Sequence, residues 1–325
     1  MSRLNGALLI GLMVALAASL WAGRVWIDPF HPGFAGATAI LVELRLPRAC
    51  LAVAIGAGLG SAGAAMQAYL RNPLADPGLF GIAPSAALGA VITLCLEAYG
   101  VHLGAWASTF FALMGAGGAM ALLGLIAGRQ GGIALFTLAG MMIASLSGAL
   151  MSLAISLAPS PFALSEIVAW LMGALSDRSW ADVWIAAPLM MVGIGCFLLA
   201  ARSLDALTLG EATARSLGVD PGRLQGLLIL GVGLTVGGSV AVAGIIGFVG
   251  LIVPHLIRPF TDRRPSSLIV PSALGGALLL VIADSLCRIV PLAGGELRLG
   301  IGLSLLGAPF FLALLWRMRR EGNWG

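Results

Sequence analysis

The stretch LLILGVGLTVGGSVAVAGIIGFVGLIVPHL, residues 227–256, contains no aspartate, glutamate, lysine or arginine. It belongs to an apolar run over residues 224–259, which is 36 residues long. A helix needs roughly 20 apolar residues to cross the hydrocarbon of a bilayer, so this run is too long for one span. Glycines at 237–238 and in the 244–250 cluster predict a break, giving one span over 224–244 and a short, partial span over 245–259.

The rest of the chain has the same apolar character. Only 10% of the 325 residues are charged, 46 are glycine, and the mean hydropathy is +1.03. Because a globular chain has about 25% charged residues, a soluble protein is excluded. Continuous apolar runs argue against a transmembrane barrel, whose strands alternate. Collagen is excluded because the glycines have no period of three.

Ten apolar segments are separated by charges, prolines or glycine clusters. They predict an all-α polytopic membrane protein with about ten transmembrane helices in a single domain over residues 1–325. The non-spanning stretches, about 24–48, 159–181 and 201–223, are too short to hold a nucleotide-binding domain, and without lysine there is no phosphate-binding loop. The segments are about 5–23, 49–70, 79–98, 103–127, 133–158, 182–200, 224–244, 245–259, 266–289 and 299–317.

The arginines predict the orientation, because short cytoplasmic loops carry the positive excess. All 18 basic residues are arginine. With both termini in the cytoplasm, twelve of these arginines lie on the cytoplasmic side. The first apolar segment is then predicted to be a retained helix, and the alternative for it is a cleaved signal peptide. The six on the outer side break the rule and are candidates for function: Arg24, Arg45, Arg48, Arg178, Arg288 and Arg298.

Three segments have glycine, turn or hydroxyl patterns that allow two interpretations each. Gly58–Gly63 matches G-x-G-x-x-G, but inside an apolar helix the glycines fit close helix packing better than a dinucleotide site. The 72–78 turn, which contains Asn72 and Leu74, is either a constriction at the inner face or a rigid connector. The serine stripe Ser145, Ser152 and Ser156 lies on one helix face and either lines a water-filled passage or packs against other helices.

Two charged regions allow two interpretations as well. Residues 203–222 form a charge-bearing inner loop with a short helix that begins near Glu211 and ends at Gly218, either a docking element or a solvated loop. At the outer rim, exposed Arg45, Arg48 and Arg288 either bind carboxylates of a partner protein or, for Arg288 with Asp284 four residues before it, form a structural pair.

Enzyme chemistry and metal binding have no support in the sequence. The three histidines are scattered, and neither G-x-S-x-G nor H-E-x-x-H occurs. His255 is a structural residue rather than a metal or haem contact. The four cysteines have no short Cys-x-x-Cys spacing and are interpreted as small core residues. We therefore expect no catalytic residue, no metal ligand and no cofactor in this chain.

Several ordered motifs resemble the iron-chelate and cobalamin uptake permease family of ABC importers. The resemblance covers residues from about 40 to 316. The matching segments are Arg45-Leu-Pro-Arg48, Gln67 with Arg71-Asn-Pro-Leu-Ala-Asp-Pro-Gly78, Gly210-Glu-Ala-x-Ala-x-x-Leu-Gly218, Gly247-Phe-Val-Gly-Leu-Ile-Val-Pro-His-Leu-Ile-Arg258 and Gly307-Ala-Pro-Phe-Phe311.

The resemblance implies a role for each candidate site. Asn72 and Leu74 match the inner gate, and the helix carrying the serine stripe matches the one that lines the passage at a two-fold axis. Arg45, Arg48 and Arg288 match arginines that meet glutamates of a binding protein. The segment that matches the coupling helix seated in an ATPase subunit includes Gly210, Glu211, Ala214, Leu217 and Gly218.

Two segments depart from the family pattern. The loop Gly128-Arg-Gln-Gly-Gly-Ile-Ala134 lacks the hydroxyl residues of a second inner constriction, so no gate is assigned there. Arg298 replaces a usual proline in the stretch before the last span, which makes it a candidate for an additional partner contact.

Together these features predict a type II ABC importer permease of the bacterial inner membrane. It is expected to form a homodimer with two ATPase subunits that bind ATP and magnesium and with a periplasmic binding protein, and to import a ferric siderophore or haem. Cobalamin is the alternative cargo, and no nucleic acid is expected as a partner. Two other classes of protein are alternatives. An ion-coupled secondary transporter would need acidic residues within the membrane, and only Asp284 nearly meets this requirement. An intramembrane enzyme has even less support in the sequence.

Overall fold

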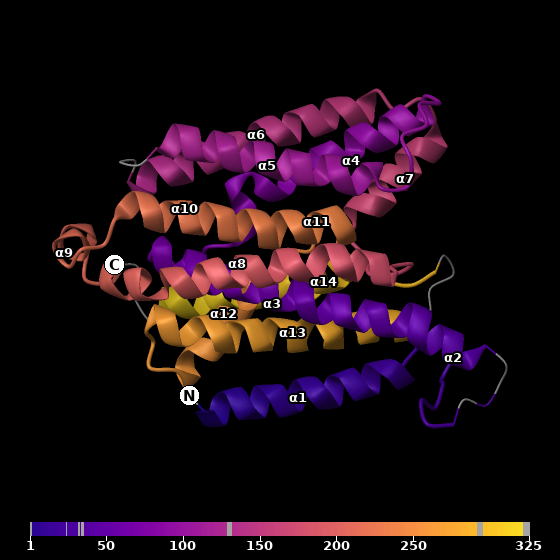
Figure 1. Ribbon diagram of the computed structural model, residues 1–325, viewed down its shortest axis with the longest axis horizontal. Helices are drawn as coiled ribbons and strands as arrows, with labels where there is room; N and C mark the ends of the chain where they lie inside the picture. Colours follow the sequence, from indigo (N-terminus) through magenta and orange to yellow (C-terminus); the bar gives the residue numbers. More distant parts are fainter. Residues whose placement is uncertain are drawn as a thin grey trace.

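The computed structural model describes residues 2–23, 25–31, 33, 36–128, 132–290 and 295–320. Figure 1 shows a bundle of helices that run roughly along the long axis of the molecule, with α1 at one side and α4, α5 and α6 at the other. The short helix α9 and the first residues of α1 lie at one end, which we call the α9 end. The starts of α8 and α14 lie at the other, which we call the far end.

The described residues form helices at all ten predicted spans. Eight stretches are long and apolar enough to cross a membrane, and α4 and α12 are shorter apolar helices. The chain is therefore a multi-pass membrane protein. The ten spans are α1 (Ser2–Trp21), α3 (Leu46–Tyr69), α4 (Ile82–Ala98), α5 (Ala107–Ala127), α6 (Ile133–Ser156), α8 (Trp180–Leu207), α10 with η3 and α11 (Pro221–Val232, Gly233–Gly237, Gly238–Ala243), α12 (Val249–Ile257), α13 (Pro265–Ile289) and α14 (Leu299–Arg320).

Glycines let α3 and α13 approach at backbone distance in the centre of the bundle. A Cβ atom added at Gly56 would lie 2.3 Å from the Gly276 carbonyl oxygen, and one at Gly60 would lie 2.1 Å from that of Ser272. On its next turn α3 meets α12, where a Cβ at Gly63 would clash with Gly250. The packing interpretation of the G-x-G-x-x-G match is thus confirmed, because only glycine leaves room for these contacts.

The long apolar run over residues 224–259 is broken where the glycines predicted. Helix α11 ends at Ala243, Gly244 has φ +71°, and Phe248 has φ +67° before α12 begins at Val249. Helix α12 has only nine residues, so it is a partial span as expected.

Two helical regions extend beyond the predicted spans. Helix α7 (Pro161–Leu171) lies within a stretch expected only to be non-spanning. Its eleven residues are too few to cross a bilayer, and Ser160 caps its start by accepting a hydrogen bond from the Ala163 amide. The second span starts earlier than residue 49, because α2 (Ala37–Ala39) and η1 (Ile40–Arg45) run directly into α3.

Three short helices complete the described elements. Helix η2 (Pro77–Phe80) lies in the turn between α3 and α4, and η4 (Arg258–Phe260) follows α12. Helix α9 (Glu211–Ser216) connects α8 to α10 and projects from the bundle (Figure 1).

Candidate functional site

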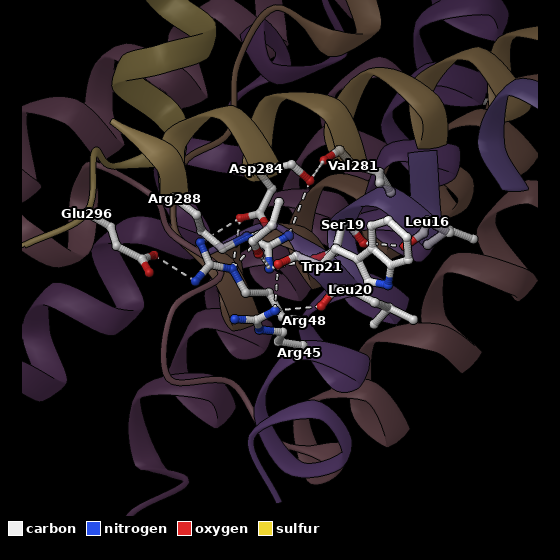
Figure 2. A network of polar contacts seen from close by, with 12 residues as sticks. Leu16, Ser19, Leu20, Trp21, Arg45, Arg48, Val281, Asp284, Arg288 and Glu296 are labelled. Carbon is white, nitrogen blue, oxygen red and sulfur yellow. Dashed lines mark hydrogen bonds and ion pairs between the residues drawn. The ribbon is translucent and has the colours of Figure 1, made fainter. Parts of the chain in front are cut away.

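A network of charged side chains occupies the far end between α3, α13 and the segment before α14 (Figure 2). The Arg48 guanidinium donates through Nε and Nη2 to the Asp284 carboxylate, at 2.8–3.0 Å. Its Nη1 donates to Glu296 Oε2 at 2.7 Å. Such charge-assisted bidentate bonds are the strong class of hydrogen bond. Arg48 therefore fixes α3 to α13 from within this chain.

The other two arginines of the network hold the C-terminal end of α1. Arg45 donates to the Leu20 carbonyl at 2.6 Å and to that of Trp21 at 3.0 Å. Arg288 donates to the carbonyls of Ser19 and Ala22 at 3.2–3.3 Å and pairs with Asp284 at 3.2 Å. The last carbonyls of a helix lack partners within it and carry the negative end of its dipole, so arginines stabilise them.

The expectation that these three arginines are exposed is wrong. Arg45 is 7% and Arg288 5% exposed, and the Arg48 side chain is 11% exposed. The physical reason is that each guanidinium satisfies acceptors inside the bundle, namely the Asp284 and Glu296 carboxylates or the α1 carbonyls. The structural pair of Asp284 and Arg288 is present, whereas contact with a binding protein stays a prediction.

The turn that contains Asn72 and Leu74 lies at the α9 end of α3. Asn72 is exposed, and its side-chain oxygen accepts a hydrogen bond from the Leu74 amide at 2.9 Å, which rigidifies the turn. Leu74 lines a cavity of about 470 Å³ together with Asp76 and Phe248, so this turn meets the break between α11 and α12. A gating role is compatible with this position and stays a prediction.

Gln67 and Arg258 tie the same region together and were not assigned such a role from the sequence. Gln67 donates to the carbonyls of Gly250 and Leu251 at 3.3 Å, and Arg258 donates to the Gln67 side-chain oxygen at 2.7 Å. A glutamine inside an apolar helix is the sequence signal that could have pointed to Gln67, because a buried polar group needs a hydrogen-bond partner. Its partner lies 191 positions along the chain, which only the fold reveals.

Helix α9 has the form expected of the short inner helix. It begins at Glu211, directly after Gly210 with φ +103°, and Gly218 ends the segment with φ +88°. Ala214 is buried, whereas Leu217 is 62% exposed. Glu211 lies 3.9 Å from Arg71, which directly precedes Asn72, so α9 and the 72–78 turn are neighbours. The docking of α9 into an ATPase stays a prediction.

The serine stripe faces away from the other helices of the chain. Ser145, Ser152 and Ser156 are all exposed. Ser152 and Ser156 donate to carbonyls of their own helix, at 3.0 and 2.8 Å. This arrangement argues against packing within the chain and leaves the stripe open to a second copy or to a passage.

Three remaining sequence features have different outcomes. In the 128–134 loop, residues 129–131 lie outside the described part of the chain, as do Arg24 and the Arg317 side chain. Arg298 directly precedes α14 and lines a cavity with Arg45 and Arg48. His255 packs its ring against Phe310 at 6.0 Å, in agreement with its structural interpretation.

The fold defines a polytopic α-helical membrane protein. The family model for the "FecCD transport family" matches residues 7–317. The chain therefore belongs to the FecCD transport family.

Relatives and a solved structure agree with this assignment. The vitamin B12 import system permease protein BtuC of Citrobacter koseri is 35% identical over 98% of this chain and 95% of its own length. BtuC of Salmonella typhi is 37% identical over 96% and 94%. YvrB of Bacillus subtilis, an uncharacterised ABC transporter permease protein, is 36% identical over 90% and 86%. A solved structure shows an inward-facing conformation of an ABC transporter that is assigned to the metal-chelate type. It superimposes on this chain with a TM-score of 0.86 at 29% sequence identity, and the match covers 98% of this chain and all of the other.

Proposed function

We propose that this chain is the permease subunit of a binding-protein-dependent importer that moves a ferric siderophore or haem across the bacterial inner membrane. Two copies of the chain would enclose the passage, and two separate ATPase subunits would supply the energy. The observation that carries the proposal is α9, a short helix exposed at one end of the bundle and in contact with the 72–78 turn through Arg71 and Glu211. A displacement of α9 by an ATPase would therefore reach this turn directly.

Charge supports an orientation with the α9 end in the cytoplasm. Arginines of the described loops concentrate at this end, and short cytoplasmic loops carry the positive excess. Both termini would then be cytoplasmic. The arginines in these loops and at the helix ends there include Arg71, Arg202, Arg215, Arg223, Arg258, Arg263 and Arg264.

The exposed face of α6 supports the pairing of two copies. The serine stripe shares this helix with large exposed apolar residues, including Met142 and Leu146. Hydroxyl groups in a bilayer are better accommodated at a protein interface or a wet passage than against lipid chains. A second copy related by a two-fold axis would use the same face on both chains.

Cobalamin is the second candidate cargo, and the BtuC relatives favour it. Their identities of 35–37% extend over nearly the whole chain. An ion-coupled secondary transporter is disfavoured by a contact: Asp284, the nearest candidate for an intramembrane ion ligand, is 1% exposed and held by Arg48 and Arg288. A carboxylate neutralised by two guanidinium groups has little tendency to bind a cation.

The experiment that tests the proposal is uptake into proteoliposomes containing this chain with the ATPase and binding protein encoded beside it. Ferric siderophores, haem and cobalamin are supplied separately with ATP and with a non-hydrolysable analogue. ATP-dependent uptake of an iron chelate is expected. Uptake of cobalamin alone would establish the second candidate, and uptake without hydrolysis would contradict the ABC mechanism.

A further inference from the structure

A polar cavity of about 500 Å³ opens at the far end, next to the charged network. Its volume lies in the range of small-molecule pockets, about 300–1,000 Å³. A second cavity of about 230 Å³ adjoins it and shares the residues Ser176, Asp177, Arg178 and Arg298. Arg178 and Arg298 therefore stand where the two cavities meet.

These two arginines differ from Arg48 and Arg288 of the charged network, each of which pairs closely with the Asp284 carboxylate. Arg48 forms three bonds of 2.8–3.0 Å to one carboxylate, whereas Arg178 comes no closer than 3.9 Å to Asp182. Asp182 is already engaged, because its Oδ2 accepts from the amide and the hydroxyl of Ser179 at 2.8 and 3.0 Å. Arg178 Nε is buried without a hydrogen-bond partner in the described part of the chain.

Arg298 is still less compensated. Among the described residues, no carboxylate lies within 4.0 Å of its guanidinium. It directly precedes α14, whose first turn contains no acidic residue, so the positive end of that helix dipole adds to its charge. The side chains of Arg178 and Arg298 are both partly buried, which weakens the screening of their charges by water.

The electrostatics at Arg178 agree with a charge that is only partly compensated. Burial lowers the pKa of the Arg178 guanidinium, Asp182 and Asp177 oppose this, and the neighbouring charge of Arg298 lowers the pKa further. Of the other acidic residues at the two cavities, Glu296 is bonded to Arg48, whereas Asp177 and Glu166 are exposed to solvent. Their charges are hydrated and screened, so they neutralise the arginines only in part.

We infer that Arg178 and Arg298 form a binding site for a carboxylate group of a small-molecule ligand at the junction of the two cavities. The planar guanidinium presents paired N–H donors that match a carboxylate, and the partial burial strengthens this bond relative to water. The inference rests on the proposed function for one point only, namely that the ligand is the transported cargo. In that case the site favours a chelate that has free carboxylates over a chelate that has none.

Arginine footprinting of the chain alone, in lipid nanodiscs, tests the site without transport. Phenylglyoxal modifies accessible arginines, and peptide mass spectrometry measures the rate at each position. Citrate is the probe, compared with sodium chloride at equal ionic strength. At citrate of about ten times its Kd, modification of Arg178 and Arg298 is expected to slow about tenfold. Arg263 and Arg264, in the loop at the α9 end, are the internal controls.

The variants Arg298→Gln and Arg264→Gln separate the site from general charge effects. Citrate is expected to lose its protection of Arg178 in Arg298→Gln and to keep it in Arg264→Gln. Two results would overturn the inference. In the first, citrate protects Arg178, Arg298, Arg263 and Arg264 of the unmodified chain equally. In the second, the binding protein protects Arg178 and Arg298 but citrate does not. Because the footprint requires no ATPase, its result is independent of the uptake experiment. Citrate protection can be absent while uptake succeeds, and it can be present while uptake fails, so the two proposals are tested separately.

Discussion

At the scale of single residues, the charged network at the far end shows that an arginine near the end of a predicted span need not be exposed to solvent. Arginines near the outer ends of two predicted spans suggested an exposed rim, yet Arg48 and Arg288 share the Asp284 carboxylate, Arg288 is buried and Arg48 is largely buried. A buried charge is tolerated only when it is paired and hydrogen-bonded. Each member of the network is therefore required by the others.

Replacing Asp284 by asparagine should destabilise the chain strongly. The variant leaves the Arg48 and Arg288 guanidinium groups facing a neutral amide, and breaking a buried pair costs about 3–5 kcal/mol. Thermal unfolding in detergent measures the loss. Glu296→Gln is the matched control, because its side chain is 28% exposed and its effect should be smaller. Equal unfolding temperatures for both variants would contradict the role assigned to Asp284.

Arg45→Gln should loosen the end of α1. The carbonyls of Leu20 and Trp21 lose their donor. These hydrogen bonds are partly buried, so the cost should not exceed about 1–3 kcal/mol, the cost of leaving a buried acceptor unsatisfied. Amide hydrogen exchange over the last turn of α1 should then be at least about fivefold faster. Arg178→Gln serves as the control, because within the described residues the Arg178 side chain forms no hydrogen bond or ion pair with α1. Unchanged exchange in Arg45→Gln would show that the bonds to α1 carry no stability.

At the scale of helices, two features organise the molecule: the close approach of α3 to α13 and the exposed helix α9. The first depends on the absence of side chains at a few positions, because interhelical packing in a bilayer gains from van der Waals contact rather than from hydrophobic burial. The second depends on Gly210 and Gly218, whose positive φ angles set α9 apart from α8 and α10.

Gly60→Ala should separate α3 from α13. The added Cβ would lie 2.1 Å from the Ser272 carbonyl oxygen, and overpacking of this kind costs about 1–3 kcal/mol. The matched control is Gly117→Ala in α5, where no heavy atom lies within 4 Å of the new Cβ. The unfolding temperatures of the two variants are compared. If Gly117→Ala were destabilised as much as Gly60→Ala, the loss of stability would come from replacing any glycine and not from a clash between α3 and α13.

Leu217→Asp should weaken ATPase binding without loss of folding. Leu217 is 62% exposed on the segment that we propose docks into the ATPase, so the change removes an apolar contact only in the complex. Co-purification of the ATPase with the tagged chain measures it. Phe260→Asp, at a residue that is 70% exposed at the same end, is the control. ATPase retention as in the unmodified chain would contradict the docking role of α9.

At the scale of the whole molecule, the two ends and one face have different properties. The α9 end carries loop arginines and α9, the far end carries the charged network and the two cavities, and α6 presents exposed serines and large apolar side chains. This distribution fits a subunit that contacts an ATPase at one end, admits a ligand at the other and pairs through α6.

Ser152→Cys should cross-link two copies in membranes treated with an oxidant. Its side chain lies on the exposed face of α6, and the same position on both chains would meet near a two-fold axis. A product of twice the chain mass on a non-reducing gel is expected. Met13→Cys on α1, at the opposite side of the bundle, is the control (Figure 1). Dimer formation by the α1 variant alone would place the interface elsewhere.

The sequence by itself determined the membrane class, the ten spans and the break between α11 and α12, because these follow from local apolar length and from glycine clusters. It also identified α9 and the packing role of Gly56, Gly60 and Gly63. What it could not determine is which charges neutralise each other, since Arg48 and Asp284 are 236 positions apart. Only the tertiary structure decided that Arg45 and Arg288 are buried and Arg48 largely so, because burial depends on helices brought together from distant parts of the chain. The same contacts left the charges of Arg178 and Arg298 only partly compensated beside a cavity.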